Sequence, residues 1–459
     1  MKRVDCLVGA RVLVLGLGES GYSAAVLLRR LGAHVVVNDQ KPRDAVPLEK
    51  VADLERRGIS VVLGSHPDDI VHAGVDWVVK NPGIPYTAPP VKQALALGIP
   101  VITEIELAYW VSEAPIIGIT GSNGKTTTTT LVGHILRVEG RDVIVAGNIG
   151  RALCAAAVET RPNQLLVAEL SSFQLLGTRT FRPWIGAVLN VYPAHLDYHG
   201  TFADYQRAKG RLFANQTHAD HAVVNADCPA SAELADGVRA TVWAFSRRVP
   251  VDRGVFLRGD AAVFRGDGPE EVLFRIGDIA LPGAHNVENV LAAALIARLA
   301  GASPAAIREA VRAFRGVEHR LEFVRELGGV RFYNDSKATN PEATKRALDA
   351  FEAPIVWIAG GLDRGLSFDS LIPSLKARVK AVVAYGQTAE QILETARRAG
   401  VDHRIRVETV EEAVPTAYAF AAPGDVVLLS PACASWDQFA SYEERGRMFK
   451  AAVHRLIRG

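Results

Sequence analysis

The chain has 459 residues, more than one hydrophobic core usually accommodates, so two or three domains are expected. Its 49% hydrophobic and 22% charged residues are ordinary for a globular protein and argue against disorder. The 52 basic residues nearly balance the 50 acidic ones, so the net charge of +2 supplies no general attraction to nucleic acid or to an anionic membrane.

The cysteines and the N-terminal segment indicate the compartment. Four cysteines, at positions 6, 154, 228 and 433, are far apart and form no CxxC pair, which argues against a disulfide framework or a zinc site. The first residues are typical of a strand entering a glycine-rich turn, not of a signal peptide, and no apolar run approaches the length of a membrane span. We therefore expect a soluble cytoplasmic protein without membrane insertion.

The first hundred residues alternate short β-branched runs with helical stretches. We expect strands at 12–16, 34–39, 61–63, 77–80 and 100–103. Between them, residues 24–32 and 89–98 have helical spacing and end in glycine. The alternation predicts a parallel sheet.

Two further series follow. The second has expected strands at 114–120, 142–147, 165–170, 185–190 and 221–227, a small antiparallel insert at 240–281 and a helix at 286–300. The third has expected strands at 330–335, 353–360, 381–386 and 425–430. The sequence thus predicts an α/β protein of three domains, at 1–111, 112–316 and 317–459, of which the central one has a parallel sheet with a small antiparallel part.

A glycine-rich turn follows the strand expected at 114–120 and precedes a helical run. Its residues are Gly121, Ser122, Asn123, Gly124, Lys125, Thr126 and Thr127. Such a turn points backbone N–H groups at an anion, where the helix dipole favours negative charge. Lys125 can reach nucleotide phosphates and Thr126 can place a hydroxyl on Mg²⁺. Ile119 stands where the general phosphate-loop motif has its first glycine, so an ordinary glycine-rich turn stays as an alternative.

Glu169 and His195 each follow an expected parallel strand. Open α/β sheets bind their ligands at the carboxyl ends of such strands, so both side chains are candidates for a magnesium site. The alternatives are an acid that caps a helix and a hydrogen-bonded loop histidine.

Near the N-terminus, Gly16, Gly18 and Gly21 match a GxGxxG turn, and Asp39 closes the next strand. By itself this pattern indicates a dinucleotide oxidoreductase.

Several motifs together resemble one family. TGSNGKTTT at 120–128 is similar to the ATP-binding loop of the Mur ligases and of the related folylpolyglutamate synthase. YNDSKATNPEAT at 333–344, GGLDRGLSFD at 360–369 and LLSPACASWDQFASYEERG at 428–446 resemble the D-glutamate-adding members. The DNPR signature of the diaminopimelate-adding members is absent. The resemblance covers essentially the whole chain. It implies Rossmann-like folds for the domains at 1–111 and 317–459 and a P-loop ATPase-like fold for the parallel sheet of the domain at 112–316.

The resemblance implies an ATP-dependent ligase that joins D-glutamate to UDP-N-acetylmuramoyl-L-alanine through an acyl phosphate, in peptidoglycan precursor synthesis. It implies ATP, two Mg²⁺ ions and a carbamylated Lys209 in a protein that acts as a monomer on small molecules. Rival hypotheses are another Mur-type or folylpolyglutamate ligase, an NAD-dependent oxidoreductase, and a P-loop switch protein.

The resemblance also implies roles for individual residues. Residues expected at ATP are those of the loop at 121–127 together with Asn286 and Asn289 of the motif at 283–289, Arg320 beside His319, Asp335 and Lys337. Residues expected at the UDP substrate are Glu19, Ser20, Asp39, Asn81, Gly83, Asn148 and Ser171. D-Glutamate is expected at Thr339, Ser435 and Tyr442, while Arg364 and Gly365 stand where some members have a lysine. The implied catalytic residues are Lys125, His195 and Lys209, and the implied metal ligands are Thr126, Glu169, His195 and Lys209.

Overall fold

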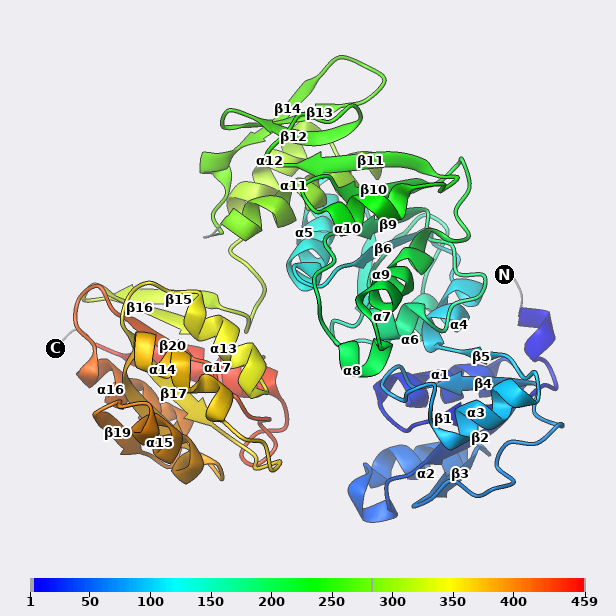
Figure 1. Ribbon diagram of the computed structural model, residues 1–459, viewed down its shortest axis with the longest axis horizontal. Coiled ribbons are helices and arrows are strands. Elements are labelled where there is room, and N and C mark those ends of the chain that lie inside the picture. The colour runs from blue at the N-terminus through cyan, green and yellow to red at the C-terminus, as the bar shows by residue number, and fades with distance from the viewer. Residues whose placement is uncertain (1–3, 282–283, 458–459) are drawn as a thin grey trace. The chain divides into compact units, whose positions relative to one another are not determined.

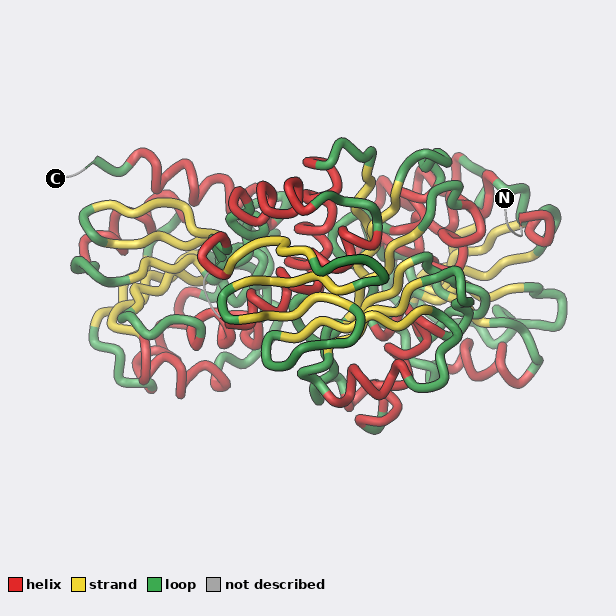
Figure 2. The backbone as a smooth tube through the Cα atoms, turned by 90° about the horizontal axis from the view of Figure 1, so that it is seen from above, coloured by secondary structure: helices red, strands yellow, loops and turns green. Residues whose placement is uncertain are grey.

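A computed structural model describes residues 4–281 and 284–457, and the chain divides into two compact units between Phe314 and Arg315. Each unit consists of sheets with helices packed against them (Figure 1; Figure 2). Most neighbouring strands pair in parallel, which confirms the predicted α/β class. The exact limits at 111 and 316 stay predictions. Among the described residues, no helix combines the length and apolar character that crossing a membrane requires.

The first sheet has the order β3-β2-β1-β4-β5, and its neighbours all pair in parallel. Its strands are β1 (Arg11–Leu15), β2 (His34–Asp39), β3 (Ser60–Leu63), β4 (Trp77–Lys80) and β5 (Val101–Ile102). Its helices are η1 (Val4–Leu7), α1 (Glu19–Arg30), η2 (Arg43–Ala45), α2 (Leu48–Arg56) and α3 (Pro89–Ala96). Because side chains alternate along a strand, Val12 and Val14 pack in one core while Leu13 and Leu15 pack in another.

Helix α4 (Glu104–Val111) follows β5 and ties the first sheet to the second within this unit. The Glu106 side chain is fully buried and accepts hydrogen bonds from the backbone N–H groups of Arg179, Thr180 and Phe181. A buried carboxylate is tolerated only with such donors, so this contact fixes α4 to the segment that precedes β9.

The second sheet has the order β14-β13-β12-β11-β10-β9-β6-β8-β7. Its strands are β6 (Ile116–Thr120), β7 (Val143–Gly147), β8 (Leu165–Glu169), β9 (Ile185–Val188), β10 (His221–Asn225), β11 (Thr241–Ser246), β12 (Gly254–Arg258), β13 (Ala261–Arg265) and β14 (Glu271–Arg275). Its helices are α5 (Lys125–Val138), α6 (Leu153–Ala157), α7 (Ser172–Leu175), α8 (Leu196–His199), α9 (Phe202–Gly210), η3 (Arg211–Phe213), α10 (Pro229–Ala232), η4 (Glu233–Ala235), η5 (Ile276–Asp278), α11 (Ala284–Leu299) and α12 (Pro304–Ala313).

The antiparallel part of this sheet is smaller than the insert predicted at 240–281. β11 pairs in parallel with both β10 and β12, and only β12, β13 and β14 are antiparallel (Figure 1). The two hairpins were recognisable from their turns. The parallel pairing of β11 was not, because a short strand in a turn-rich segment has the same side-chain pattern in either direction.

The C-terminal unit has one sheet of order β15-β16-β20-β17-β18-β19, in which only β15 and β16 pair antiparallel. Its strands are β15 (Glu322–Leu327), β16 (Val330–Asn334), β17 (Ile355–Gly360), β18 (Val379–Tyr385), β19 (His403–Arg406) and β20 (Val426–Leu429). Its helices are α13 (Pro341–Asp349), η6 (Asp369–Leu371), α14 (Ile372–Arg378), α15 (Ala389–Arg398), α16 (Val410–Phe420) and α17 (Tyr442–Arg455). The two edge strands, β15 and β19, were not predicted because they are rich in charged residues, as exposed edges often are.

The ends of the parallel strands carry the loops that matter for function. Loops with predicted site residues leave the carboxyl ends of β1, β2, β4, β6, β7, β8, β9, β16 and β20. Carboxyl ends of parallel strands meet at one edge of a sheet, so residues far apart in the sequence come together there.

Candidate active site

The glycine-rich loop lies between β6 and α5, as predicted from the sequence. Gly124 is the N-cap residue of α5 and has a φ of 80°, in the left-handed region that favours glycine. A Cβ at this position would also overlap the side-chain oxygen of Asn289. The N–H groups at the first turn of an α-helix, together with the helix dipole, make this end of α5 suited to a phosphate.

Contacts to neighbouring segments fix the shape of this loop. The Asn123 N–H donates to Oδ1 of Asn190 at 2.9 Å, just after β9. The Ser122 hydroxyl lies 3.0 Å from the hydroxyl of Tyr205 in α9 and accepts from the Tyr192 N–H at 2.9 Å. The loop is therefore held from two sides.

Lys125 begins α5, and its Nζ donates to the carbonyl oxygens of Gly121 at 2.8 Å and Ser122 at 3.0 Å. The next two residues, Thr126 and Thr127, lie on the same first turn, with Thr126 buried and Thr127 partly exposed. An ammonium group thus lies over the loop beside the helix N-terminus.

Two asparagines of α11 lie at the loop. Nδ2 of Asn289 donates to Oδ1 of Asn286 at 3.1 Å, and Asn289 packs against Gly124. Gly283, the first residue of the motif that drew attention to this pair, lies outside the described residues.

Lys209, in α9, is 1% exposed, and its Nζ donates to the same Gly121 carbonyl at 2.9 Å. The Nζ atom also lies 4.5 Å from the centre of the Tyr205 ring. Burial, and then the nearby charge of Lys125, hold the pKa of Lys209 well below its ordinary value. Two amino groups therefore share one carbonyl oxygen, an arrangement that disfavours charge on both.

Glu169 ends β8 and is 2% exposed. Its Oε1 accepts a hydrogen bond from Nδ2 of Asn148 at 3.0 Å, whereas its buried Oε2 has no hydrogen-bond partner among the described residues. A buried carboxylate oxygen without a donor is costly unless a cation or donor reaches it.

His195 lies on the N-terminal side of α8 with a φ of 54°, an uncommon conformation for a non-glycine residue. Its exposed ring packs edge-on against Phe173, with 5.0 Å between ring centres, and lies 6.3 Å from the Tyr205 ring. The Tyr205 ring therefore lies near both the His195 ring and the Lys209 amino group.

The chemistry of these groups fits a divalent cation. Oε2 of Glu169 is a carboxylate oxygen that lacks a partner among the described residues, and the Thr126 hydroxyl is on the first turn of α5. Oxygen ligands of this kind suit Mg²⁺. An unmodified ammonium at Lys209 does not suit it, because like charges repel.

In the first sheet, Asn81 lies against the glycine-rich turn. A Cβ on Gly16 would lie 2.8 Å from Cβ of Asn81, and one on Gly18 would lie 2.7 Å from its Nδ2. Asp39 shapes the same turn, because its two carboxylate oxygens accept from the N–H groups of Leu17 at 2.7 Å and Lys41 at 2.9 Å. A role of Asp39 at the UDP group stays a prediction.

The other predicted UDP residues occupy different settings. Glu19 is exposed and pairs with Lys50 at 2.6 Å, and Ser20 follows it in the first turn of α1. The Gly83 N–H donates to Oδ1 of Asn81 at 3.3 Å. Ser171 caps α7, because its hydroxyl accepts from the Gln174 N–H.

In the C-terminal unit, Asp335 is buried beside Arg320. Its Oδ2 accepts from the Ser430 hydroxyl at 2.8 Å, and its Oδ1 accepts from the Leu321 N–H at 3.2 Å. Burial raises the pKa of Asp335 to about 7, against smaller lowering effects of these two donors and of the Arg320 charge.

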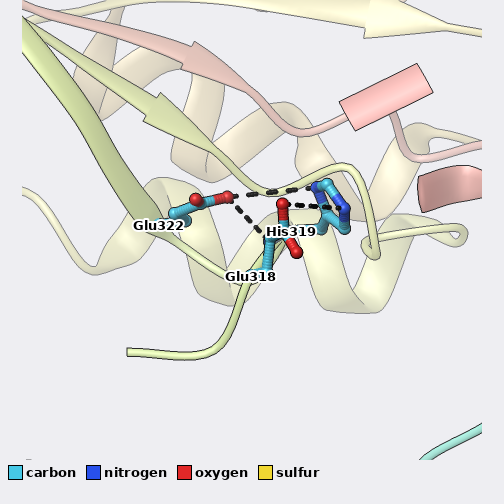
Figure 3. A group of neighbouring side chains, drawn as sticks. All are labelled: Glu318, His319 and Glu322. Carbon is cyan, nitrogen blue, oxygen red and sulfur yellow. Dashed lines mark hydrogen bonds and ion pairs between the residues drawn. The ribbon is translucent and has the colours of Figure 1, made fainter. Parts of the chain in front are cut away.

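His319 is packed between Glu318, Glu322 and α17, and Figure 3 shows the three side chains turned toward one another. They lie close enough together to hold a metal ion. However, the Lys450 ammonium already lies 3.0 Å from a Glu318 oxygen and 2.5 Å from a Glu322 oxygen. We interpret the cluster as an ion-paired network that orients the segment before Arg320, not as a metal site.

A glycine of α17 makes room for this network. A Cβ on Gly446 would overlap the His319 ring. His319 itself has a φ of 64°, and its carbonyl accepts from the Lys337 N–H at 3.0 Å. The contact therefore aligns the His319 segment with the loop after β16.

Lys337, Thr339 and Tyr442 belong to the same group of loops. Nζ of Lys337 lies 5.7 Å from the centre of the Tyr442 ring, and the Thr339 N–H donates to the Lys337 carbonyl at 2.9 Å. Ser435 is 2% exposed, whereas Arg364 is exposed on the loop that follows β17.

Sequence reasoning missed Arg445. This residue is fully buried, and its guanidinium donates to the Ser336 hydroxyl at 3.0 Å and to the carbonyls of Ser336 at 2.8 Å, Cys433 at 3.1 Å and Gly360 at 3.4 Å. One side chain thus joins the loops after β16, β17 and β20. Its place in the motif at 428–446 was the available signal, but spacing alone does not indicate an inward-pointing arginine.

A cavity of about 590 Å³ lies elsewhere. Its lining includes Arg11, His34 and Ser60, the first residues of β1, β2 and β3. These residues lie at the N-terminal ends of their strands, whereas the glycine-rich turn at 16–21 follows the C-terminal end of β1. The cavity is therefore separate from the predicted UDP site.

The raised pKa of Asp335 predicts a pH-dependent stability. Because the folded pKa of about 7 lies above the unfolded value of about 3.9, the stabilising contribution is full below the unfolded pKa and is lost as pH rises toward 7. Between pH 4 and 7, the free energy of unfolding of the wild type should fall relative to Asp335→Asn by up to about 1.4 kcal/mol per pH unit. Urea unfolding of both proteins across this range measures the difference, and parallel pH curves would contradict the prediction.

Comparison with known proteins agrees with this arrangement. Residues 10–103 match the Mur ligase MurD-like N-terminal domain, residues 119–297 the Mur ligase middle domain, and residues 319–433 the Mur ligase glutamate ligase domain. These three matches, in order, confirm the predicted three-domain fold class.

Full-length relatives are similar throughout. The UDP-N-acetylmuramoylalanine–D-glutamate ligase of Geobacillus kaustophilus is 54% identical over 447 residues, covering 97% of this chain and 98% of the relative. The enzyme of that name from Bacillus cytotoxicus is 50% identical over 457 residues and is covered completely, as is this chain.

Solved structures share the fold at lower identity. MurF from Acinetobacter baumannii has a TM-score of 0.57 at 19% identity, covering 99% of this chain and 93% of the other. The UDP-N-acetylmuramate-alanine ligase MurC from Thermotoga maritima has a TM-score of 0.55 at 19% identity, covering 97% and 99%. With the domain matches and the full-length relatives, the conclusion is that this chain belongs to the Mur ligase family.

Proposed function

We propose that the chain is an ATP-dependent ligase that adds D-glutamate to UDP-N-acetylmuramoyl-L-alanine, forming ADP and phosphate, in the synthesis of peptidoglycan precursors. The observation that carries the proposal is the 54% identity, over 97% of the chain, to a relative named for this reaction. The arrangement of Lys125, Lys209 and Glu169 around the phosphate loop supports it.

The first step activates a carboxylate. The negative charge of the alanine carboxylate repels an amine, and oxide is a very poor leaving group. Transfer of the γ-phosphoryl group of ATP to a carboxylate oxygen gives an acyl phosphate and releases ADP. Such transfer depends on positioning and charge neutralisation, which the first turn of α5 and the Lys125 ammonium provide.

The second step forms the amide. The amine of D-glutamate attacks the acyl carbon to give a tetrahedral intermediate, which loses a proton from its nitrogen and expels phosphate to leave the amide. The protein needs no covalent nucleophile for this. We assign D-glutamate binding to Thr339, Ser435 and Tyr442 and the approach to ATP to Arg320, Asp335 and Lys337, with Arg445 holding these loops in register.

We expect two Mg²⁺ ions at this site, because the Glu169 carboxylate and the Thr126 hydroxyl supply oxygen ligands of the kind that Mg²⁺ prefers. We assign Thr126, Glu169, His195 and a carbamylated Lys209 as the groups that hold them. When bound, Mg²⁺ neutralises phosphate charge during transfer.

The surroundings of Lys209 support the proposed carbamylation. Its neutral amine can attack CO₂ and lose a proton, which leaves an anionic carbamate. Burial and the neighbouring Lys125 both favour the neutral amine at the start. The carbamate would also replace the like-charge repulsion that an ammonium at Lys209 would meet from Lys125 with an attraction.

The rival functions have less support. Only the GxGxxG turn at 16–21 suggested an NAD-dependent oxidoreductase, whereas the matches to Mur ligases extend over all three sheets. Other amino-acid ligases of the family share the fold but not the 54% identity. A monomeric state and a cytoplasmic location stay predictions.

One assay tests the proposal. ADP release should require both UDP-N-acetylmuramoyl-L-alanine and D-glutamate, and L-glutamate should not replace the D isomer. Turnover with a folate, or with UDP-N-acetylmuramic acid and L-alanine instead, would contradict it.

Lys125→Ala should lower kcat by about 10²–10³-fold, because a preorganised charge stabiliser is lost. The control is Lys92→Ala, a lysine of α3 in the first sheet. Steady-state ADP release by the folded variants is the measurement, and near-normal kcat for Lys125→Ala would remove the loop lysine from the mechanism.

Lys209→Ala should be nearly inactive, and acetate should restore part of the activity by placing a carboxylate in the vacated space. In the wild type, ¹³C-labelled CO₂ should give a carbamate NMR signal that Lys209→Ala lacks. A wild type without this signal, or a fully active Lys209→Ala variant, would refute the modification.

A further inference from the structure

Lys80 is a buried lysine for which the proposed mechanism has no use. It ends β4, is 1% exposed, and its Nζ donates to the carbonyls of Ile84 at 2.9 Å, Pro82 at 3.3 Å and Asn81 at 3.5 Å. No carboxylate pairs with it among the described residues. Burial lowers the pKa of Lys80 to about 8, which reflects the cost of keeping an ammonium there.

Tyr198 links this lysine to the second sheet. Its hydroxyl lies 3.1 Å from Nζ of Lys80 and also lies within hydrogen-bond distance of the carbonyls of Pro82, at 3.1 Å, and Ile84, at 3.0 Å. A tyrosine hydroxyl donates one hydrogen bond, so it can accept from Lys80 and donate to one of these carbonyls. Residues 118 positions apart thereby form one polar cluster.

The two sides of the cluster belong to two parts of the predicted site. On one side, the loop that begins with Asn81 packs against the glycine-rich turn of β1. On the other side, Tyr198 lies in the short helix α8 that His195 precedes, and its ring packs edge-on on Phe173, with 4.6 Å between ring centres. Phe173 also contacts the His195 ring.

An apolar side chain of similar length could fill the space without the cost of burying an ammonium, but it would leave the three carbonyls without this donor. The ammonium instead gathers three carbonyls of one loop and a hydroxyl of another, which fixes both loops in direction as well as in position.

We propose that Lys80 and Tyr198 form a brace that sets the separation between the loop at 81–84 and His195, and thereby positions the acyl carboxylate for phosphoryl transfer. This inference rests on the proposed function. There the substrate is held at its UDP end by the first sheet and reacts at its alanine end beside the second. Small errors in such a separation cost rate, because reacting atoms must approach within a narrow range.

Tyr198→Phe is the main test, because it keeps the ring packing on Phe173 and removes only the hydroxyl. We expect kcat to fall by about tenfold, a fraction of the loss that a misplacement of about 1 Å causes. The dissociation constant for UDP alone and KM for ATP should change by less than about twofold, since neither end is lost, only their spacing. Tyr418→Phe, in α16 of the C-terminal unit, is the matched control and should retain wild-type kcat.

Lys80→Met and the double variant complete the experiment. If the two side chains act as one brace, the double variant should lose little more kcat than Lys80→Met alone, whereas independent roles would make the losses multiply. Lys80→Arg keeps a positively charged donor and should therefore lose less kcat than Lys80→Met. Should Lys80→Met fail to fold, Tyr198→Phe and Lys80→Arg still decide the question.

The outcomes separate the brace from the proposed reaction. If the wild type turns over, a wild-type kcat for Tyr198→Phe would overturn the brace alone. So would a loss of UDP affinity as large as the loss of kcat/KM, because the pair would then only shape the UDP loop. A wild type without turnover on UDP-N-acetylmuramoyl-L-alanine and D-glutamate would overturn both.

Discussion

The sharing of one carbonyl oxygen by two lysines is the interaction on which the site depends. Lys125 and Lys209 both reach the Gly121 carbonyl, one from the start of α5 and the other from α9. Lys125 places positive charge where phosphates are expected, whereas burial and the nearby Lys125 disfavour charge on Lys209. The Glu169 oxygen that lacks a hydrogen-bond partner within the described part of the chain adds a carboxylate group to the same site. Because charged groups of both signs lie close together here, the site favours reactions and modifications that change the local charge. Phosphoryl transfer and carbamylation are two of these.

Parallel sheets explain how these groups come together. Gly121 follows β6, Glu169 ends β8, and His195 lies beyond β9, three strands that are neighbours in the order β9-β6-β8. Close packing of the loops then depends on residues without side chains, such as Gly124 against Asn289. The predicted reactive residues are therefore far apart in the sequence, and one edge of a sheet brings them close together.

Much of this could be predicted from the sequence, for physical reasons that also mark the limits. Buried strands such as β9 and β20 are continuous apolar runs, and the phosphate loop at 121–127 lies between a strand and a helix, so both were recognised. The edge strand β19 was missed because its residues are charged, and the parallel pairing of β11 was mistaken because pairing direction leaves no trace in side-chain alternation. Arg445 and Lys80 were overlooked because a charged residue is ordinarily assigned to the surface, and only the fold reveals carbonyls gathered around it.

The contact between Gly446 and His319 has a consequence for any attempt to stabilise this protein. Glycine within a helix is unfavourable by roughly 0.5–1 kcal/mol relative to alanine, so position 446 in α17 would be an obvious target for consensus or propensity-based redesign. Here the missing methyl group is the space that the His319 ring fills. An alanine at position 446 would improve helix propensity but would displace the His319 ring, which aligns the Arg320 segment. Selection for thermal stability alone would therefore tend to disturb the loop that is assigned to ATP in the proposed reaction.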